Sequence, residues 1–200
     1  IGGGPSGLSS AIKVKQLASA EGKDVSVCVL EKGSEIGAHI LSGNVFEPTA
    51  LNELIPDWKE KEAPLNSPAT KDIVKFMISE NSSFNIPFPS FLIPTFNNHG
   101  NYVMSLANFT RWLATQAESL GVEIFPGFTA AEVIFEENVV KGVLTGEMGI
   151  SKDGEKKPSY QPSMELRGKY TVFAEGCRGH LGKQLIKKFN LDENRDPQHY

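Results

Sequence analysis

The apolar positions at the start of the chain first follow the period of a helix and then that of a buried strand. Apolar residues recur at helical spacing between Leu8 and Leu17, so this stretch is predicted to form an amphipathic helix. Residues 25–30, which follow, are mostly apolar and rich in valine, which favours a buried strand that ends at Glu31.

The second half of the chain shows the same alternation of helical and strand patterns. A helical pattern covers 106–120 and ends at Gly121, a plausible residue to follow a helix C-terminus. Strands are predicted beyond it, the polar stretch 146–162 is predicted to be an exposed hairpin or loop, and a last strand leads into a last helix. The expected strands are 122–125, 131–135, 139–145 and 169–174, and the expected helix is 181–188.

Three glycines precede the first helix in the pattern G-x-G-x-x-G. Gly2 would permit a tight turn, Gly4 a close approach of backbone to a pyrophosphate, and Gly7 close packing of helix on strand. Glu31 lies 24 positions after Gly7, near the usual spacing for an acid that binds a ribose hydroxyl. A bare glycine motif is also compatible with an ordinary loop, but the order turn, helix, strand, acid predicts a dinucleotide-binding βαβ unit. The acid disfavours a 2′-phosphate, so FAD or NAD is expected rather than NADP.

Two further segments are candidates for contact with the same ligand. The strand 169–174 ends in a glycine turn at 174–176, where backbone amides could meet a phosphate or ribose. The small-residue loop 33–43 follows the first strand, at the sheet edge where ligands bind in α/β folds; it is otherwise a simple connector.

Residues 64–100 carry five prolines and show little regular periodicity. The apolar run 84–96 contains no charged residue and is too short and proline-broken to span a bilayer as a helix. It is either an insertion packed on its own core or an exposed apolar plateau that docks on a membrane or a partner.

Composition narrows the range of functions. The 200 residues are 40% hydrophobic and 22% charged with a net charge of −4, which is ordinary for a globular protein and disfavours nucleic acid as a partner. The two cysteines, Cys28 and Cys177, form no metal or disulfide motif. Because only Ile1 precedes the glycines and no initiator Met is present, we interpret the chain as an internal fragment.

The order of these elements resembles the two-domain, hydroxylase- or reductase-type FAD-binding fold, a mixed α/β fold in which a second domain interrupts the nucleotide-binding domain. On this basis we predict FAD-binding parts at 1–63 and 105–200, an exposed hairpin at 146–165, and a quinone- or membrane-facing insertion at 64–104. Short blocks of sequence then closely resemble one family, electron-transfer flavoprotein:ubiquinone oxidoreductase. These blocks are 28–32, 36–43, 56–61, 63–66, 97–102 and 173–185.

The resemblance implies a monotopic enzyme, an electron-transferring-flavoprotein dehydrogenase, of the matrix face of the mitochondrial inner membrane or of a bacterial membrane. Such an enzyme passes electrons from reduced electron-transfer flavoprotein to ubiquinone through FAD and a [4Fe–4S] cluster, whose ligands are expected outside these residues. No catalytic nucleophile, acid–base pair or metal ligand is expected in this chain, because FAD carries the redox chemistry. The implied FAD contacts are Gly2, Gly4, Pro5, Ser6 and Gly7 at the pyrophosphate, Glu31 at the ribose with Lys32 beside it, Ser42 and Gly43 towards the flavin, and Ala174, Glu175 and Gly176.

The same resemblance favours the plateau interpretation of the apolar run. The residues expected to face the membrane or the quinone are Phe84, Ile86, Phe88, Phe91, Leu92, Ile93 and Phe96. His39, His99 and His180 are either proton relays to quinone or hydrogen-bonded structural residues, and the structural interpretation is favoured. The alternatives for the whole are a geranylgeranyl-reductase-like or FixC-like flavoprotein of the same fold, and a module that holds FAD only for structure.

Overall fold

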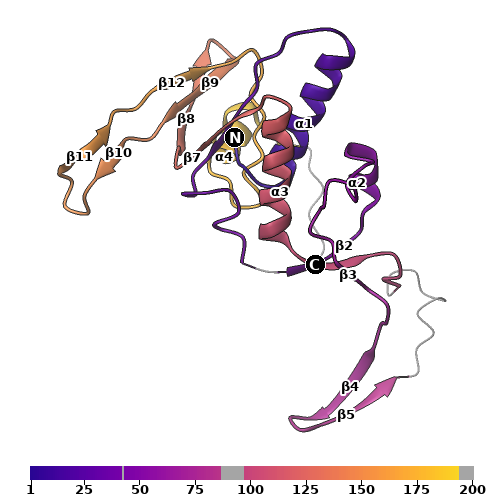
Figure 1. The fold of residues 1–200 in the computed structure, drawn as a ribbon. Helices are drawn as coiled ribbons and strands as arrows, with labels where there is room; N and C mark the ends of the chain where they lie inside the picture. The colour runs from indigo at the N-terminus through magenta and orange to yellow at the C-terminus, as the bar shows by residue number, and fades with distance from the viewer. Residues whose placement is uncertain (42, 87–96, 194–200) are drawn as a thin grey trace. The chain divides into compact units, whose positions relative to one another are not determined.

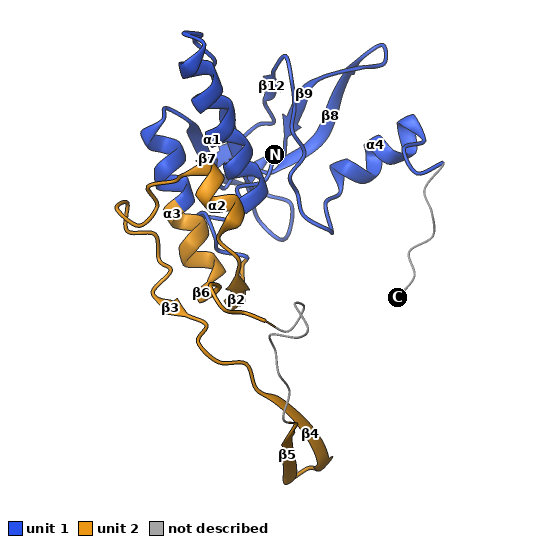
Figure 2. Cartoon of the chain, turned by 90° about the vertical axis from the view of Figure 1, so that its right-hand side faces the viewer, with its two compact units in different colours: residues 1–39, 113–200 blue, residues 40–112 orange. Residues whose placement is uncertain are grey.

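The computed structural model describes residues 1–41, 43–86 and 97–193. Two compact units make up the chain: one combines Ile1–His39 with Leu113–Tyr200, and the other is Ile40–Trp112 (Figure 2). The predicted domain limits at 63 and 104 remain predictions. Each unit is described by itself below.

The first unit contains a pair of parallel strands and the helix that leads into them. Strand β1 (Cys28–Glu31) pairs in parallel with β7 (Glu123–Pro126), and helix α1 (Pro5–Ala20) joins the glycine turn to β1. Proline at the first helical position has no N–H to leave unpaired and a backbone angle already suited to a helix, so α1 begins at Pro5, earlier than the predicted residue 8. The mixed α/β class and the turn–helix–strand order are confirmed.

An antiparallel sheet completes this unit. Its order is β12-β9-β8, from strands β8 (Ala130–Glu136), β9 (Val139–Thr145) and β12 (Glu165–Arg167). Helix α4 (Leu181–Phe189) buries Leu181 in a core cluster with Val133 and Val143. Strands β10 (Met148–Ile150) and β11 (Lys156–Gln161) form a hairpin, which confirms the hairpin or loop predicted at 146–162.

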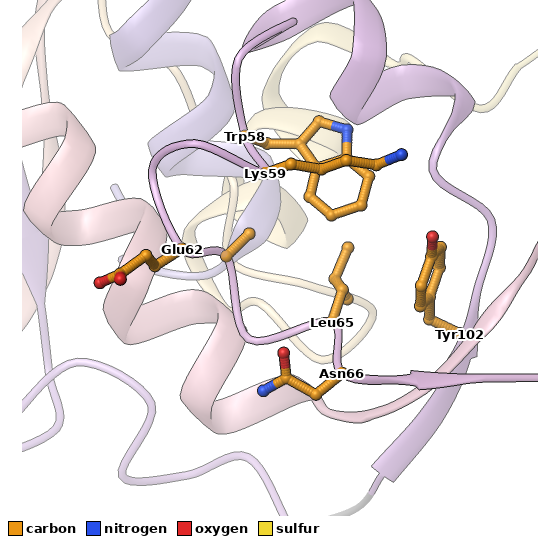
Figure 3. A pocket seen from close by; sticks show the side chains of 7 residues that line it. Trp58, Lys59, Glu62, Leu65, Asn66 and Tyr102 are labelled. Carbon is orange, nitrogen blue, oxygen red and sulfur yellow. The ribbon is translucent and has the colours of Figure 1, made fainter.

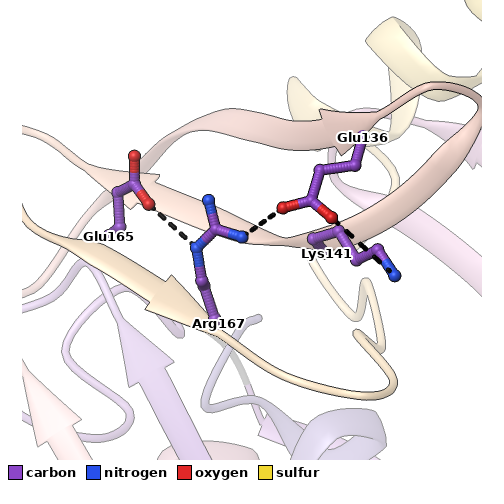
Figure 4. A network of polar contacts seen from close by, with 4 residues as sticks. All are labelled: Glu136, Lys141, Glu165 and Arg167. Carbon is purple, nitrogen blue, oxygen red and sulfur yellow. Dashed lines mark hydrogen bonds and ion pairs between the residues drawn. The ribbon is translucent and has the colours of Figure 1, made fainter.

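Exposed charges on all three strands of this sheet form a small network (Figure 4). The guanidinium of Arg167 on β12 donates to the carboxylates of Glu136 and, at 3.0 Å, Glu165, while Lys141 lies 4.0 Å from Glu136. These side chains are about half exposed, so water screens the pairs and each adds little to stability. The Arg167–Glu136 pair joins the two outer strands, β12 and β8, across β9.

The second unit contains a three-stranded antiparallel sheet. Its order is β2-β6-β3, from β2 (Gly43–Phe46), β6 (Tyr102–Ser105) and the short β3 (Ser67–Pro68). Helix α2 (Thr49–Leu54) follows β2. Helix α3 (Leu106–Ser119) begins directly after β6, and its residues from Leu113 on belong to the first unit. The rings of Phe46 and Phe109 pack with centroids 4.8 Å apart.

The first part of 64–100, where the sequence shows little periodicity, contains regular strands. Strands β4 (Val74–Ser79) and β5 (Ser82–Ile86) form an antiparallel hairpin (Figure 1). The alternation that marks a strand spans only a few residues on each side, and a register shift between Met77 and Ser79 interrupts it. Residues 87–96, which include most of the predicted plateau, lie outside the described residues.

One predicted strand, 169–174, is not regular secondary structure. Residues 172–174 are extended beside Ile1: the Ile1 amine donates to the Val172 carbonyl at 2.6 Å, and the Ala174 N–H donates to the Ile1 carbonyl at 2.8 Å. Two hydrogen bonds to a single residue do not make a strand ladder.

Candidate dinucleotide-binding site

Two of the segments that the sequence nominates, the glycine turn and residues 174–176, meet at the end of β1 in the first unit. The Gly2 N–H donates to the Leu30 carbonyl at 2.8 Å, so the glycine turn lies beside β1, and Ala174 pairs with Ile1 on its other side. The carboxyl end of β1, the glycine turn and residues 174–176 therefore lie next to one another. In parallel sheets this is the edge at which dinucleotides bind.

Gly2 and Gly7 are required by close backbone contacts. Gly2 has a φ of +102°, and a Cβ there would lie 2.4 Å from the Ala174 carbonyl oxygen. A Cβ at Gly7 would lie 2.0 Å from the Gly2 carbonyl oxygen. Neither position can accept a side chain unless the backbone moves. The positive φ of Gly2 agrees with the tight turn expected there, whereas Gly7 is required by the Gly2 carbonyl and not by the expected packing of helix on strand.

Gly4 differs from its neighbours. A Cβ at this position would have no atom of the described residues within 4 Å, so the space beside it is open. Gly4 is also the N-cap of α1, which no described side chain caps by a hydrogen bond. The first N–H groups of this sixteen-residue helix and its positive dipole end are thus available to an anion. An open cradle before an uncapped helix fits the pyrophosphate of a dinucleotide.

Glu31 stands at the end of β1, as the motif requires. Its Oε2 accepts from the Gly3 N–H at 2.8 Å and its Oε1 from the Gly33 N–H at 2.7 Å. Each oxygen keeps a lone pair, so the carboxylate can accept ribose hydroxyls while it holds both turns. Lys32 beside it is exposed, and the ribose role of Glu31 stays a prediction.

The third segment contains a contact that the sequence analysis missed. Glu175 directs its carboxylate to the N-terminus of α4, where Oε2 accepts from the Gly182 N–H at 2.8 Å and Oε1 from the Leu181 N–H at 3.3 Å. Its side chain is only 11% exposed. The residue types gave no signal for this contact, because both donors are backbone N–H groups. Direct FAD contacts by Ala174, Glu175 and Gly176 remain predictions.

The other nominated residues are less constrained. Gly43 lies on β2 in the second unit, where a Cβ would be 3.0 Å from the Met104 carbonyl oxygen, and Ser42 is outside the described residues. His39 and His99 are exposed, as is His180, whose Nδ1 lies 3.5 Å from Glu175 Oε1. Their roles as relays or structural residues remain open predictions.

The second unit contains a cavity of about 510 Å³ that the sequence analysis did not anticipate (Figure 3). Buried Trp58 and Leu65 form part of its wall, and Tyr102 meets Trp58 edge to face with ring centroids 5.8 Å apart. Lys59 and Asn66 add polar groups. The indole N–H of Trp58 is already donated to an asparagine, Asn52, at 2.7 Å, so it is engaged within the unit.

Comparison with known proteins places this geometry in context. Residues 1–56 match the model of an NAD(P)-binding Rossmann-like domain. Over its whole length the chain is 59% identical to the electron transfer flavoprotein-ubiquinone oxidoreductase of Pseudomonas aeruginosa, of which it covers 36%. It is 50% identical to the human mitochondrial protein of that name, of which it covers 32%. A flavin-dependent brominase superposes with a TM-score of 0.57 at 18% identity, over 94% of this chain and 38% of that chain, which confirms the fold. The chain thus spans about a third of the length of the curated relatives that it matches.

Proposed function

The chain is homologous over its whole length to electron transfer flavoprotein-ubiquinone oxidoreductases, and from this homology we propose that it binds FAD and serves electron transfer from reduced electron-transfer flavoprotein to ubiquinone. The observation that carries the FAD assignment is the open cradle at Gly4 before the uncapped N-terminus of α1. A cradle of this kind accepts a pyrophosphate with backbone N–H groups alone.

Each part of the edge has a distinct task in this proposal. The Gly2–Gly7 turn and α1 bind the pyrophosphate, and Glu31 orients the adenosine ribose. The 174–176 turn gives a second backbone surface. FAD supplies the redox chemistry when bound, while these residues hold it in one orientation and exclude water. The Glu31 carboxylate, braced by Gly3 and Gly33, would repel a 2′-phosphate, which supports FAD over an NADP-type ligand.

We also propose that the β4–β5 hairpin contributes to monotopic membrane attachment. Phe76 and Phe84 face each other across the strands with ring centroids 5.5 Å apart, and both remain about half exposed. Val74 and Ile86 pair on the same face, whereas Lys75 and Asn85 pair on the other. This extends the predicted apolar plateau to include β4. None of the helices that the structure describes is long and apolar enough to cross a bilayer.

An amphipathic hairpin is suited to shallow insertion into one leaflet. Ubiquinone is itself confined to the bilayer by its tail, so the same surface would bring the enzyme to its substrate. The cellular location that we propose is the matrix face of the mitochondrial inner membrane, or a bacterial membrane. A [4Fe–4S] cluster belongs to the same proposal, with ligands that the family resemblance expects outside these residues.

Anaerobic titration of the flavin-loaded protein tests the proposal. Reduced electron-transfer flavoprotein should bleach the flavin absorbance, and a soluble ubiquinone analogue should restore it. A flavin that electron-transfer flavoprotein does not reduce would support the geranylgeranyl-reductase-like alternative or a module with structural FAD. Those alternatives are disfavoured by the names of relatives with 50–59% identity.

A further inference from the structure

Glu175 connects two structures that lie on either side of it in the sequence. The preceding residue, Ala174, lies close to the glycine turn: a Cβ on Gly2 would be 2.4 Å from the Ala174 carbonyl oxygen. After it, the Glu175 carboxylate accepts two N–H groups at the start of α4. One residue therefore links the position of α4 to the backbone beside the glycine turn.

The chain is shaped to let this carboxylate approach the helix. A Cβ at Gly179 would lie 2.5 Å from the Glu175 Cβ and 2.8 Å from its Oε2, so only glycine leaves this side chain undisturbed. The negative charge also meets the positive end of the α4 dipole, with the side chain 11% exposed. A carboxylate held by two N–H groups, a helix end and a glycine has little freedom to turn towards a ligand.

We propose that Glu175 is a positioning residue for the flavin cofactor: its side chain locks the 174–176 turn against Gly2 by capping α4. This inference rests on the proposed function, because it concerns the geometry of the FAD cradle. Loss of the cap would leave two N–H groups of α4 unpaired. Residues 174–176 would then be free to shift away from Gly2. The bound flavin would then be held more loosely and in a changed orientation.

The test compares Glu175→Ala and Glu175→Gln with the unaltered flavin-loaded protein. Apoprotein is titrated with FAD well below the melting temperature, and visible circular dichroism of the bound flavin reports its orientation. The dissociation constant should rise roughly tenfold or more in Glu175→Ala, since hydrogen bonds to a charged group are at stake, and less in Glu175→Gln, which keeps one acceptor. The flavin dichroism should change in both.

Asp72→Asn is the matched control. Asp72 also accepts two hydrogen bonds, from the backbone and side chain of Asn98, but it lies in the second unit. This variant should leave the FAD dissociation constant and the flavin dichroism unchanged.

The outcomes separate the possible failures. Folded Glu175 variants with unaltered FAD affinity and dichroism would overturn the positioning role while leaving the proposed function intact. If the unaltered protein binds no FAD, the proposed function fails and this inference fails with it. If Glu175→Ala does not fold, Gly179→Ala crowds the same carboxylate with all donors and acceptors retained. That variant must then show the same loss of affinity and change of dichroism, or the inference is wrong.

Discussion

The Gly3 backbone N–H donates a 2.8 Å hydrogen bond to the carboxylate of Glu31, which joins the glycine turn to the end of strand β1. The second oxygen of the same carboxylate holds Gly33, at the start of the following loop. Glu31 is therefore a brace within the protein as well as the acid expected at the ribose. Substitution should affect both properties.

Replacing Glu31 should weaken FAD binding and lower stability together. Loss of a charge-assisted hydrogen bond in Glu31→Ala is expected to reduce FAD affinity by roughly 1.5–3 kcal/mol. The unpaired Gly3 and Gly33 N–H groups should also lower the melting temperature of the apoprotein. Glu31→Gln, which keeps one acceptor, should lose less of each. An unchanged FAD dissociation constant in Glu31→Ala would show that the carboxylate acts only as a brace.

The glycines of the turn should respond differently to substitution. Gly4→Val adds a side chain where no described atom lies within 4 Å of the Cβ, so the apoprotein should fold with a near-normal melting temperature. That side chain would fill the space proposed for the pyrophosphate, so the purified protein should lack flavin absorbance. A flavin-loaded Gly4→Val protein would contradict the proposed cradle.

Gly7→Ala is the companion variant. Alanine normally favours a helix over glycine by roughly 0.8–1.0 kcal/mol, yet the new Cβ would meet the Gly2 carbonyl oxygen at 2.0 Å. Overpacking of this kind costs roughly 1–3 kcal/mol, so the variant should be destabilised even without FAD. Thermal unfolding of the two apoproteins separates the roles: Gly7→Ala should melt lower, and equal melting temperatures would contradict this assignment.

The sequence predicted the first unit well because its signals are local and mutually consistent. The 3.6-residue period of α1, the apolar run of β1, the glycine spacing and Glu31 all specify one arrangement. The partners of Glu175 could not be read in the same way. They are backbone N–H groups at Leu181 and Gly182, and a backbone donor leaves no residue-type signal in the sequence.

The second unit was predicted less well, and for a related reason. Strands β2 and β6 are four residues each and pair across a long sequence separation, from Gly43 with Ser105 to Phe46 with Tyr102. Such short strands carry too few alternations to stand out from loops. The prolines of 64–100 also suggested irregular chain, whereas Pro68 lies in the short strand β3 and β4–β5 contains no proline.

Asp72, two residues before β4, forms two hydrogen bonds with one distant residue of the second unit. Asp72 accepts from the Asn98 side-chain amide at 2.7 Å and from the Asn98 N–H at 3.2 Å. The hydrogen bond from the Asn98 side chain, followed by that from its backbone, holds the pKa of Asp72 below its ordinary value. A lowered folded-state pKa means that the bond contributes stability above the unfolded pKa and loses it as pH falls through the folded value.

Hydrogen exchange at the hairpin should therefore be acid-sensitive. After correction for intrinsic exchange, protection of the β4–β5 amides should be full near neutral pH and should fall below about pH 4, the ordinary range of an aspartate. Asp72→Asn should show reduced protection at neutral pH and a flatter pH response. The β8–β9 amides serve as an internal control. If the β4–β5 amides of Asp72→Asn lose protection at low pH as strongly as those of the unaltered protein, a titratable group other than Asp72 causes the effect.

The apolar face of the hairpin leads to the last prediction. Phe76 is 55% exposed and Phe84 51%, and a two-stranded hairpin is marginally stable in water by itself. Transfer of each ring into lipid is worth roughly 1.5–3 kcal/mol, so loss of both should weaken membrane partition roughly a hundredfold or more. We expect the double variant Phe76→Asp, Phe84→Asp to stay with the supernatant when liposomes are sedimented, and to retain FAD.

The matched control places the same charges on other exposed apolar positions. Leu17 on α1 is 53% exposed and Val139 on β9 is 54% exposed, and both belong to the first unit. Leu17→Asp, Val139→Asp should remain on the liposomes, because added charge alone is not the cause of release. If the hairpin variant also remains bound and reduces quinone fully, this face is not the anchor. If it instead unfolds and loses flavin, the two rings are packed in a core of the intact enzyme, and the apolar face has a structural role.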